Sequence, residues 1–276
     1  MGHPDTPQHR ISPDNLDRED GARHLTDFLQ AHRQRDARVR LEWGPTGALA
    51  LAPTSYAVVV DVLCFTTTLT VAVERGITVW PFPWRDDRAA AYAAERDAVL
   101  AVSRSVAGPG DLSLAPGSFA RADGVERAVL PSPNGSTISA LLTDSGATVV
   151  GASLRNAAAV VDWLAAAIGA DDTIAVIPAG ERWPDGSLRP AVEDLWGAGA
   201  VVAGLADRGL AELSPEARVA ESAFRAVRPR LAEQLAGCAS GREQIAAGYA
   251  DDVRVAAEAD ESDAVPVLVD GAFRAV

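Results

Sequence analysis

The sequence contains no lysine, and its histidines all lie near the N-terminus. All 25 basic residues are arginine, and the four histidines are His3, His9, His24 and His32. Schiff-base chemistry, a pyridoxal phosphate linkage and a P-loop lysine are therefore excluded. A histidine-based triad, a His-ligated zinc or a phosphohistidine would need the N-terminal segment to fold back over the site. The remaining chemistry is that of carboxylates, hydroxyls, amides, arginine, cysteine and an oxygen-ligated metal ion.

Cysteine, long apolar runs and positive charge are also scarce. Cys64 and Cys238 match no zinc or redox spacing, so we expect reduced thiols. No apolar run reaches the roughly 18 residues that cross a bilayer, and the first ten residues lack an apolar signal core. We therefore expect a cytoplasmic protein without a membrane partner. A net charge of −13 argues against nucleic acid as a partner, although an anionic metabolite can still bind through a metal ion, arginines or helix N-termini.

Short apolar segments alternate with helical patterns along most of the chain. The expected strand-then-helix pairs are 57–63 with 66–74, 127–130 with 136–142, 148–151 with 157–168, and 173–177 with 191–206. This alternation predicts an α/β fold, layered α/β/α, with a largely parallel or mixed sheet. Further helices are expected after residue 209, at 215–227, 229–236 and 241–249. Terminal strands at 265–269 and 272–276, joined by Asp270-Gly271, complete the C-terminal segment.

The remaining segments are less regular. Residues 1–36 are polar and proline-bearing, so we expect a flexible leader with one short helix at 24–31. Residues 37–276 then form one α/β domain or two closely packed lobes. A β-hairpin is expected from 38–43 and 48–51 around Gly44-Pro45-Thr46-Gly47, and long loops are expected at 107–123 and 178–190. The first of these loops should lie near the functional site.

Three segments run from a strand into a helix N-terminus through small, hydroxyl or amide residues: VVVDVLCFTTT, AVLPSPNGST and VVGASLRN. In an open parallel sheet such loops lie at the carboxyl ends of strands, where ligands bind, and a helix N-terminus attracts anions. Each segment also fits a turn followed by a simple N-cap. The candidate anion-binding residues are Thr66, Thr67, Thr68, Asn134, Gly135, Ser136, Thr137, Arg155 and Asn156.

Acidic residues supply a candidate metal site. Asp61 lies in an apolar strand, where a carboxylate is costly unless it pairs with arginine, caps a helix or binds a metal. The segment PAGERWPDGSLRPAVEDLWGAG adds Glu181, Arg182, Glu193 and Asp194. Because neighbouring helical residues point about 100° apart, we expect one of Glu193 and Asp194 to face a metal and the other to meet arginine or solvent. Asp61, Glu181 and Glu193 or Asp194 are thus candidate ligands for Mg²⁺.

Cys64 does not fit a phosphatase nucleophile. A cysteine phosphatase needs an arginine six positions later, where this chain has Thr70. A haloacid-type phosphatase needs an aspartate two positions after its nucleophilic aspartate, where this chain has Leu63. We therefore interpret Cys64 as a packed residue or part of a pocket wall.

Taken together, these motifs resemble those of the 2-phosphosulfolactate phosphatase family over residues 43–272. VVVDVLCFTTT is similar to a family stretch Asp-Val-Leu-Arg-Ala-Thr-Thr-Thr, and SPNGST, LRNAAAV, IPAG and EDLWGAG also match. The resemblance implies an α/β fold, Mg²⁺, and release of phosphate from a small organic phosphate that also carries acid groups. This chain departs from the pattern at Cys64, where the family has arginine. Arg155, Arg182 and Arg189 are candidates for the replacement cation.

The main hypothesis is a Mg²⁺-dependent phosphatase that acts on a small anionic organic phosphate. In it the expected catalytic residues are Asp61, Thr66, Thr67 and Glu193, the expected metal ligands are Asp61, Glu181, Glu193 and Asp194, and the expected substrate-binding residues are Thr68, Asn134, Gly135, Ser136, Thr137, Arg155, Asn156 and Arg182. One alternative is a non-catalytic protein that binds a phosphorylated or sulfonated metabolite. Another is a lyase or isomerase that acts on a phosphorylated acid. A homodimer is left open.

Overall fold

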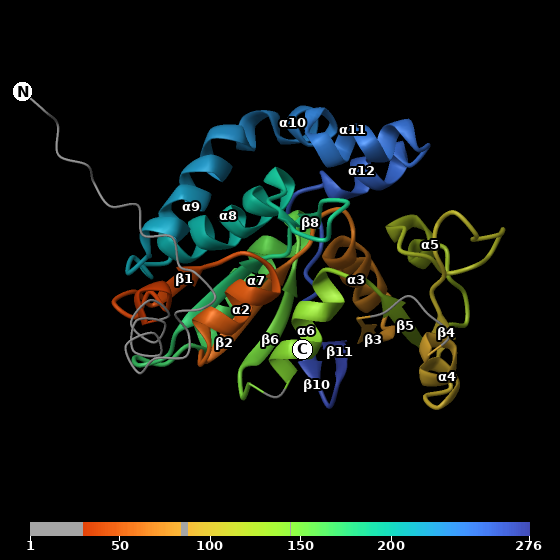
Figure 1. Ribbon diagram of the computed structural model, residues 1–276, viewed down its shortest axis with the longest axis horizontal. Coiled ribbons are helices and arrows are strands. Elements are labelled where there is room, and N and C mark those ends of the chain that lie inside the picture. Colours follow the sequence, from red (N-terminus) through yellow and green to blue (C-terminus); the bar gives the residue numbers. More distant parts are fainter. Residues whose placement is uncertain (1–29, 84–87, 144) are drawn as a thin grey trace, which may run out of the picture.

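The computed structural model describes residues 30–83, 88–143 and 145–276 (Figure 1). The expected leader at 1–36 and its helix at 24–31 therefore lie largely outside the described residues. Strands and helices alternate from residue 39 to residue 207, which confirms the layered α/β class. None of the helices described is both long enough and apolar enough to span a membrane.

Within the described residues, one sheet holds nine strands in the order β1-β7-β2-β6-β10-β11-β3-β5-β4. Its strands are β1 (Val39–Leu41), β2 (Tyr56–Val60), β3 (Thr78–Phe82), β4 (Val99–Leu100), β5 (Arg127–Pro131), β6 (Thr148–Ala152), β7 (Ile174–Pro178), β10 (Pro266–Val269) and β11 (Ala272–Ala275). A separate two-stranded antiparallel sheet consists of β8 (Glu181–Arg182) and β9 (Leu188–Arg189).

The C-terminal hairpin divides the large sheet into two parallel groups. Strands β1, β7, β2 and β6 are parallel to one another, and so are β3, β5 and β4. The β10–β11 hairpin, which turns through Asp270 and Gly271 as expected, pairs antiparallel with β6 on one side and with β3 on the other. Three successive antiparallel pairings make the two groups run in opposite directions along the sheet. The sheet is therefore mixed.

Helices cover both faces of the sheet. They are α2 (Gly44–Leu51), α3 (Phe65–Glu74), α4 (Arg88–Ala94), α5 (Pro116–Ala120), α6 (Gly135–Thr143), α7 (Ala157–Ala167), α8 (Val192–Asp207), α9 (Pro215–Val227), α10 (Leu231–Gly237), α11 (Ala239–Ala246) and α12 (Ala250–Ala256). Two 3₁₀ helices, η2 (Leu154–Asn156) and η3 (Arg228–Arg230), precede α7 and α10.

The strand sequences explain this double cover, because successive side chains of a strand point to opposite faces. Along β2, Val58 and Val60 pack into one hydrophobic cluster with residues of α7, α8 and α9. Ala57 and Val59 pack into a second cluster with residues of α2, α3 and α6. A strand that is buried on both faces is apolar at every position, as the run Val58-Val59-Val60 is.

Helix α3, which follows β2, is almost completely enclosed. In α3 every residue from Phe65 to Val73 is buried. It lies against α5, α6 and η2 as well as strands β3, β6 and β11, so it has no solvent face. Its threonines can be buried because their hydroxyls bond to the backbone, as described below.

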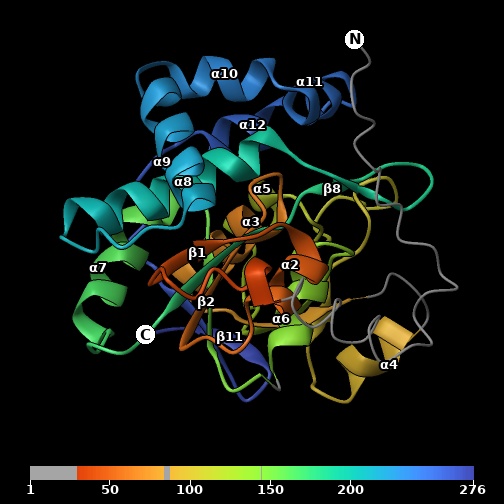
Figure 2. The same cartoon turned by 60° about the vertical axis from the view of Figure 1, so that its left-hand side comes forward.

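The C-terminal helices form a layer beyond α8. Helix α9 packs along α8, and α12 contacts α5. In Figures 1 and 2, α10, α11 and α12 lie together at one side of the molecule, next to α8 and α9. They bring residues from the end of the chain to the loops that follow the strands.

Three expectations about irregular segments need correction. The segment expected as a hairpin contains strand β1 followed by helix α2; β1 pairs with β7, and Pro45 lies in the first turn of the helix, where a missing N–H costs nothing. The expected loop at 107–123 contains helix α5, which begins at Pro116. The loop at 178–190 contains the β8–β9 hairpin, and α12 follows the last helix that the sequence predicted.

Candidate active site

Asp61 joins the loop after β2 to the loop after β5. One carboxylate oxygen, Oδ1, accepts the N–H of Phe65 at 3.1 Å, and the other, Oδ2, accepts the N–H of Gly135 at 3.0 Å. The side chain is only 6% exposed. Each carboxylate oxygen can accept more than one hydrogen bond, so both keep acceptor capacity. Asp61 is thus held at a defined position where two strand-to-helix loops meet.

The threonines after Asp61 hold this loop in place. The Thr66 hydroxyl donates to the Asp61 carbonyl at 2.8 Å and accepts the Asp61 N–H at 2.9 Å. Thr67 donates to the carbonyl of Val62, and Thr68 donates to that of Leu114. All three side chains are fully buried. The hydroxyls are therefore occupied by the backbone, and Thr66 and Thr67 fix the turn that presents Asp61.

The second strand-to-helix loop, SPNGST, touches the first. A Cβ on Gly135 would lie 2.2 Å from Cδ1 of the Phe65 ring, so only glycine allows this approach. Asn134 Nδ2 donates to Glu181 Oε2 at 3.1 Å, which ties the loop to β8. Ser136 and Thr137 turn their hydroxyls to the carbonyls of Leu130 and Pro133. These contacts connect Asp61 through Gly135 and Asn134 to Glu181.

Asp194 joins the loops after β2 and β7. It lies in the first turn of α8 and accepts the N–H of Val62 at 2.7 Å and that of Gly180 at 2.8 Å. Glu193 points elsewhere, and its Oε2 lies 3.5 Å from Cys238 Sγ at the end of α10. Both carboxylates are buried, although one of them was expected to meet arginine or solvent. The C-terminal helices, which cover Glu193, explain the difference.

The buried carboxylates repel one another. Burial raises the pKa of Asp61 to about 7, and the negative charges of Glu181 and Glu193 add to this rise, while the N–H donors of Phe65 and Gly135 oppose it. Burial, followed by the charges of Asp61 and Glu193, also raises the pKa of Asp194 well above its usual range. None of the ion pairs found among the described residues includes any of these four carboxylates.

The carboxylates do not form a closed metal cage. Within the part of the chain that the structure describes, no group of three or more histidine, cysteine, aspartate or glutamate side chains is arranged to hold a metal ion. Mg²⁺ differs from zinc in this respect, because it usually takes one or two carboxylates together with water and substrate phosphate. Asp61, Glu181, Glu193 and Asp194 repel one another and have no arginine partner among the described residues, so their chemistry would suit Mg²⁺ with an open coordination shell.

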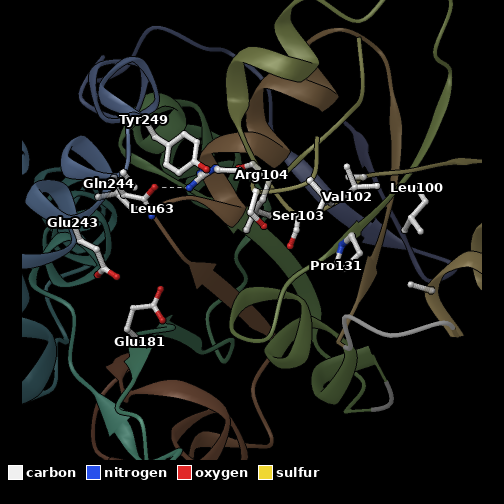
Figure 3. Close-up of a pocket in the computed structure, with 16 residues that line it drawn as sticks. Leu63, Leu100, Val102, Ser103, Arg104, Pro131, Glu181, Glu243, Gln244 and Tyr249 are labelled. Atoms are coloured by element: carbon white, nitrogen blue, oxygen red, sulfur yellow. Dashed lines mark hydrogen bonds between the residues drawn. The ribbon is translucent and has the colours of Figure 1, made fainter. Parts of the chain in front are cut away.

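A cavity of about 700 Å³ lies beside these loops (Figure 3). Among the described residues, Glu181 is the one expected site residue that lines it. Figure 3 shows Glu181 and Glu243 at one side of the cavity, Arg104, Gln244 and Tyr249 at another, and Leu100, Val102 and Pro131 at a third. The cavity thus offers an acidic side, a basic side and an apolar wall.

Arg104 brings a guanidinium group to Cys64. Its Nη2 lies 2.6 Å from Cys64 Sγ and 3.0 Å from the Leu114 carbonyl, and its Nε lies 3.2 Å from Asp252 Oδ2. Burial raises the pKa of the Cys64 thiol to about 12, although the Arg104 charge opposes this rise. Cys64 is therefore a protonated, packed residue behind Arg104, which agrees with the first of its two expected roles; it is not among the residues that line the cavity.

The other arginines singled out in the sequence lie elsewhere. Arg155 pairs with Glu258 and with Glu74, the last residue of α3, so roughly 15 Å of helix separates that partner from the Asp61 end. Asn156 forms a capping box with Ser153 and bonds the Ala264 carbonyl. The side chain of Arg182 donates to the Gly186 carbonyl within its own hairpin. Among these residues, none is seen to contact the cavity.

Sequence reasoning missed the residues that line the far side of the cavity. Arg104 follows the short strand β4, and that position after an apolar segment was the one local feature that could have indicated it. Glu243, Gln244 and Tyr249 come from α11 and the turn that follows it, and Asp252, which pairs with Arg104 and does not line the cavity, comes from α12. No local pattern distinguishes them from ordinary polar residues on the surface of a helix, because only the packing of α12 on α5 brings them to the site.

Three features come together in this α/β protein: buried carboxylates after the strands, a glycine-permitted contact between two strand-to-helix loops, and a cavity with an arginine, which is the usual location of a ligand site in such folds. The comparison with family models agrees with this class. Residues 48–271 match the model of the 2-phosphosulpholactate phosphatase family, and the chain belongs to that family. The family's name describes phosphatases, so a small phosphate compound is the expected kind of substrate. A search of curated proteins found no match.

Proposed function

We propose that this protein is a Mg²⁺-dependent phosphoric monoester hydrolase that releases phosphate from a small acidic organic phosphate, as 2-phosphosulfolactate is. One observation carries the proposal. Four carboxylates, Asp61, Glu181, Glu193 and Asp194, interact electrostatically beside a cavity, and no arginine is paired with them among the described residues. Such a cluster is unfavourable without a cation, and a bound cation makes it favourable.

Asp61 and Glu181 are the proposed metal ligands on the cavity side, with Asp194 and Glu193 behind them. When bound, Mg²⁺ would polarise the phosphate ester and lower the pKa of a water molecule. Asn134 holds Oε2 of Glu181, which leaves Oε1 available to the cavity. The amides of Phe65, Gly135, Val62 and Gly180 hold the two aspartates, so these oxygens need little rearrangement when the ligand arrives.

Under this proposal the threonines do not contact the substrate but hold the loop that carries Asp61 in place. Thr66 and Thr67 fix the turn that presents Asp61, and Thr68 ties that turn to Leu114 in the wall of the cavity. Ser136 and Thr137 stabilise the first turn of α6, whose N–H at Gly135 bonds Asp61. Preorganised groups of this kind favour the transition state because they need not reorganise during the reaction.

The test is a phosphate-release assay with and without Mg²⁺, on a panel that includes phosphosulfolactate and phospholactate. We expect Mg²⁺-dependent release of inorganic phosphate and its loss after treatment with a chelator. Product analysis by NMR identifies a lyase or isomerase, because phosphate would remain attached to the product. Tight binding of these compounds in a thermal-shift screen, without phosphate release, would instead identify a binding protein.

A further inference from the structure

We propose that Arg104 binds a second acid group of the substrate, apart from the phosphate, and so selects for phosphorylated acids. The inference rests on the proposed function, because it names the residue that recognises the part of the substrate that does not react. It uses a group that lies outside the strand-to-helix loops and comes from the segment after β4.

The position of Arg104 supports this role. Its side chain is 12% exposed, and it lines the cavity together with Glu181. Its guanidinium contacts groups from four parts of the chain: Cys64 in the loop after β2, the Leu114 carbonyl before α5, Gln244 in α11 and Asp252 in α12. A buried arginine held from several sides loses little conformational freedom when an anion binds.

The guanidinium has capacity for an incoming anion. An arginine carries five N–H groups. For the two N–H groups of Nη1, one acceptor is found among the described residues, which is Gln244 Oε1. On Nη2, one of the two acceptors is the Cys64 thiol, and sulfur is a weak acceptor. A carboxylate or sulfonate oxygen would replace that contact with a stronger, charge-assisted hydrogen bond.

Asp252 positions Arg104 without fully satisfying it. Its Oδ2 is 3.2 Å from Arg104 Nε, but neither atom has a hydrogen-bond partner, because the two are poorly aligned. Burial also raises the pKa of Asp252 above its usual range, although the Arg104 charge opposes this rise. The pair therefore fixes where the guanidinium lies without using the N–H groups of Nη1 and Nη2, whose acceptors are Gln244, Cys64 and the Leu114 carbonyl.

The distribution of charge around the cavity sets the orientation of the substrate. Glu181 and Glu243 line one side, and Arg104 lines another together with the neutral side chains of Gln244 and Tyr249 (Figure 3). An anion placed at the acidic side needs a metal ion, whereas an anion at Arg104 does not. A substrate with two acid groups would therefore place its phosphate at the metal side and its other acid at Arg104.

The test compares phospholactate with its carboxyl methyl ester, which carries the same phosphate without the second acid. For the wild type, we expect kcat/KM to favour the free acid by roughly 100-fold, the effect of a charged contact in a buried site. In Arg104→Gln this preference should fall to within about threefold of unity, mainly through KM for the acid. Arg104→Lys should give an intermediate preference, because lysine keeps the positive charge but cannot donate the two parallel hydrogen bonds of a guanidinium.

Two variants control for loss of structure. Arg40→Gln removes another buried arginine, which bonds to carbonyls beside β1 and does not line the cavity, so the preference should be unchanged. If Arg104→Gln unfolds, Arg104→Gln with Asp252→Asn removes both charges and keeps the pair neutral. An unchanged preference in either Arg104 variant, or no preference in the wild type, overturns the inference while phosphate release still supports the phosphatase.

Binding of the same two compounds, measured by calorimetry, separates the two proposals further. If the wild type releases no phosphate but binds the acid more tightly than the ester, and Arg104→Gln abolishes that difference, the phosphatase proposal fails and the role of Arg104 stands. Equal binding of both compounds by the wild type contradicts the role of Arg104 whatever the activity.

Discussion

The two halves of the site are built in different ways. On one side, Asp61 follows β2, Gly135 begins α6 after β5, and Asp194 lies in the first turn of α8. Hydrogen bonds between side chains and backbone hold these segments together. On the other side, Glu243 and Gln244 come from α11, and Gln244 reaches Arg104 through a hydrogen bond between the two side chains. The first half is suited to precise positioning of reacting atoms. The second half can change with little cost to the fold, which suits selection of a substrate.

The largest expected effect is the difference in activity between a substitution in the first half and the same chemical change in the second half. We expect Asp61→Asn to lower kcat by about 10³-fold or more, because it removes a charge that the proposed metal site needs. Glu243→Gln, the same chemical change on the helical side of the cavity, should lower kcat/KM by less than about tenfold. Steady-state phosphate release from phospholactate measures both.

A loss of activity could also come from unfolding, so the folding of both variants must be measured. Circular dichroism and thermal melts should show that both remain folded. If Asp61→Asn keeps full Mg²⁺-dependent activity, or if Glu243→Gln is the more damaging change, the assignment of chemistry to the strand ends is wrong.

The next effect concerns Mg²⁺ and pH. The raised pKa of Asp61, about 7, means that the folded metal-free protein binds a proton that the unfolded chain loses above about pH 4. The stability contributed by Asp61 is therefore present at low pH and declines as pH rises from about 4 to about 7. Mg²⁺ should offset this decline, and a concentration of about 100 times Kd would add about 2.7 kcal/mol.

Thermal melts in chelator and in excess Mg²⁺ measure this effect. The increase in Tm caused by Mg²⁺ should be greater at pH 8 than at pH 5. In Asp61→Asn both the increase and its pH dependence should shrink. An increase that is equal at the two pH values would contradict the placement of the metal at Asp61.

A smaller effect follows from the contact between the two loops. Gly135→Ala would place a Cβ 2.2 Å from Cδ1 of Phe65 and 3.0 Å from Asp61 Oδ2, so the loops must separate. Such overpacking typically costs about 1–3 kcal/mol, and activity should fall as well because the Gly135 N–H holds Asp61. On the helical side, Gly237→Ala at the end of α10 meets nothing within 4 Å. It should be neutral or stabilise by up to about 1 kcal/mol.

The same contrast explains how much could be predicted from sequence. The βα alternation, the loop at Asp61 and the hairpin at Asp270-Gly271 were recognised because each depends on residues that are neighbours in the chain. The segment at 44–51 was misread, because short apolar residues around Gly and Pro fit both a hairpin and a helix. Pairing of β1 with β7, more than 130 residues away, decided between them.

The site shows the same limit. The sequence identified Asp61, Gly135 and Asp194, but not that the hydroxyls of Thr66 and Thr67 turn to the backbone, since either orientation is compatible with an N-terminal turn. The burial of Glu193 depends on Cys238 and the helices around it. The position of Arg104 depends in part on contacts with Cys64 and Gln244, which lie 40 and 140 positions away in the chain.

The smallest expected effect compares the two cysteines, one from each half of the site. Both thiols are buried, and burial raises the pKa of Cys64 to about 12 and that of Cys238 to about 11, with the charge of Glu193 contributing to the second. Because the thiolate is the reactive form, both should react far more slowly than a free thiol at pH 8, and Cys238 should react about tenfold faster than Cys64.

Mass spectrometry after timed alkylation distinguishes the two sites, and denatured protein provides the value for full reaction. If the rigidity assigned to the strand-end loops is real, Cys64 should also respond less to warming than Cys238, since its reaction requires the loop at Asp61 to open. Faster labelling of Cys64 would show that this loop opens readily. The side of the site that comes from the C-terminal helices would then be the more rigid one, and the roles assigned to the two halves of the site would be reversed.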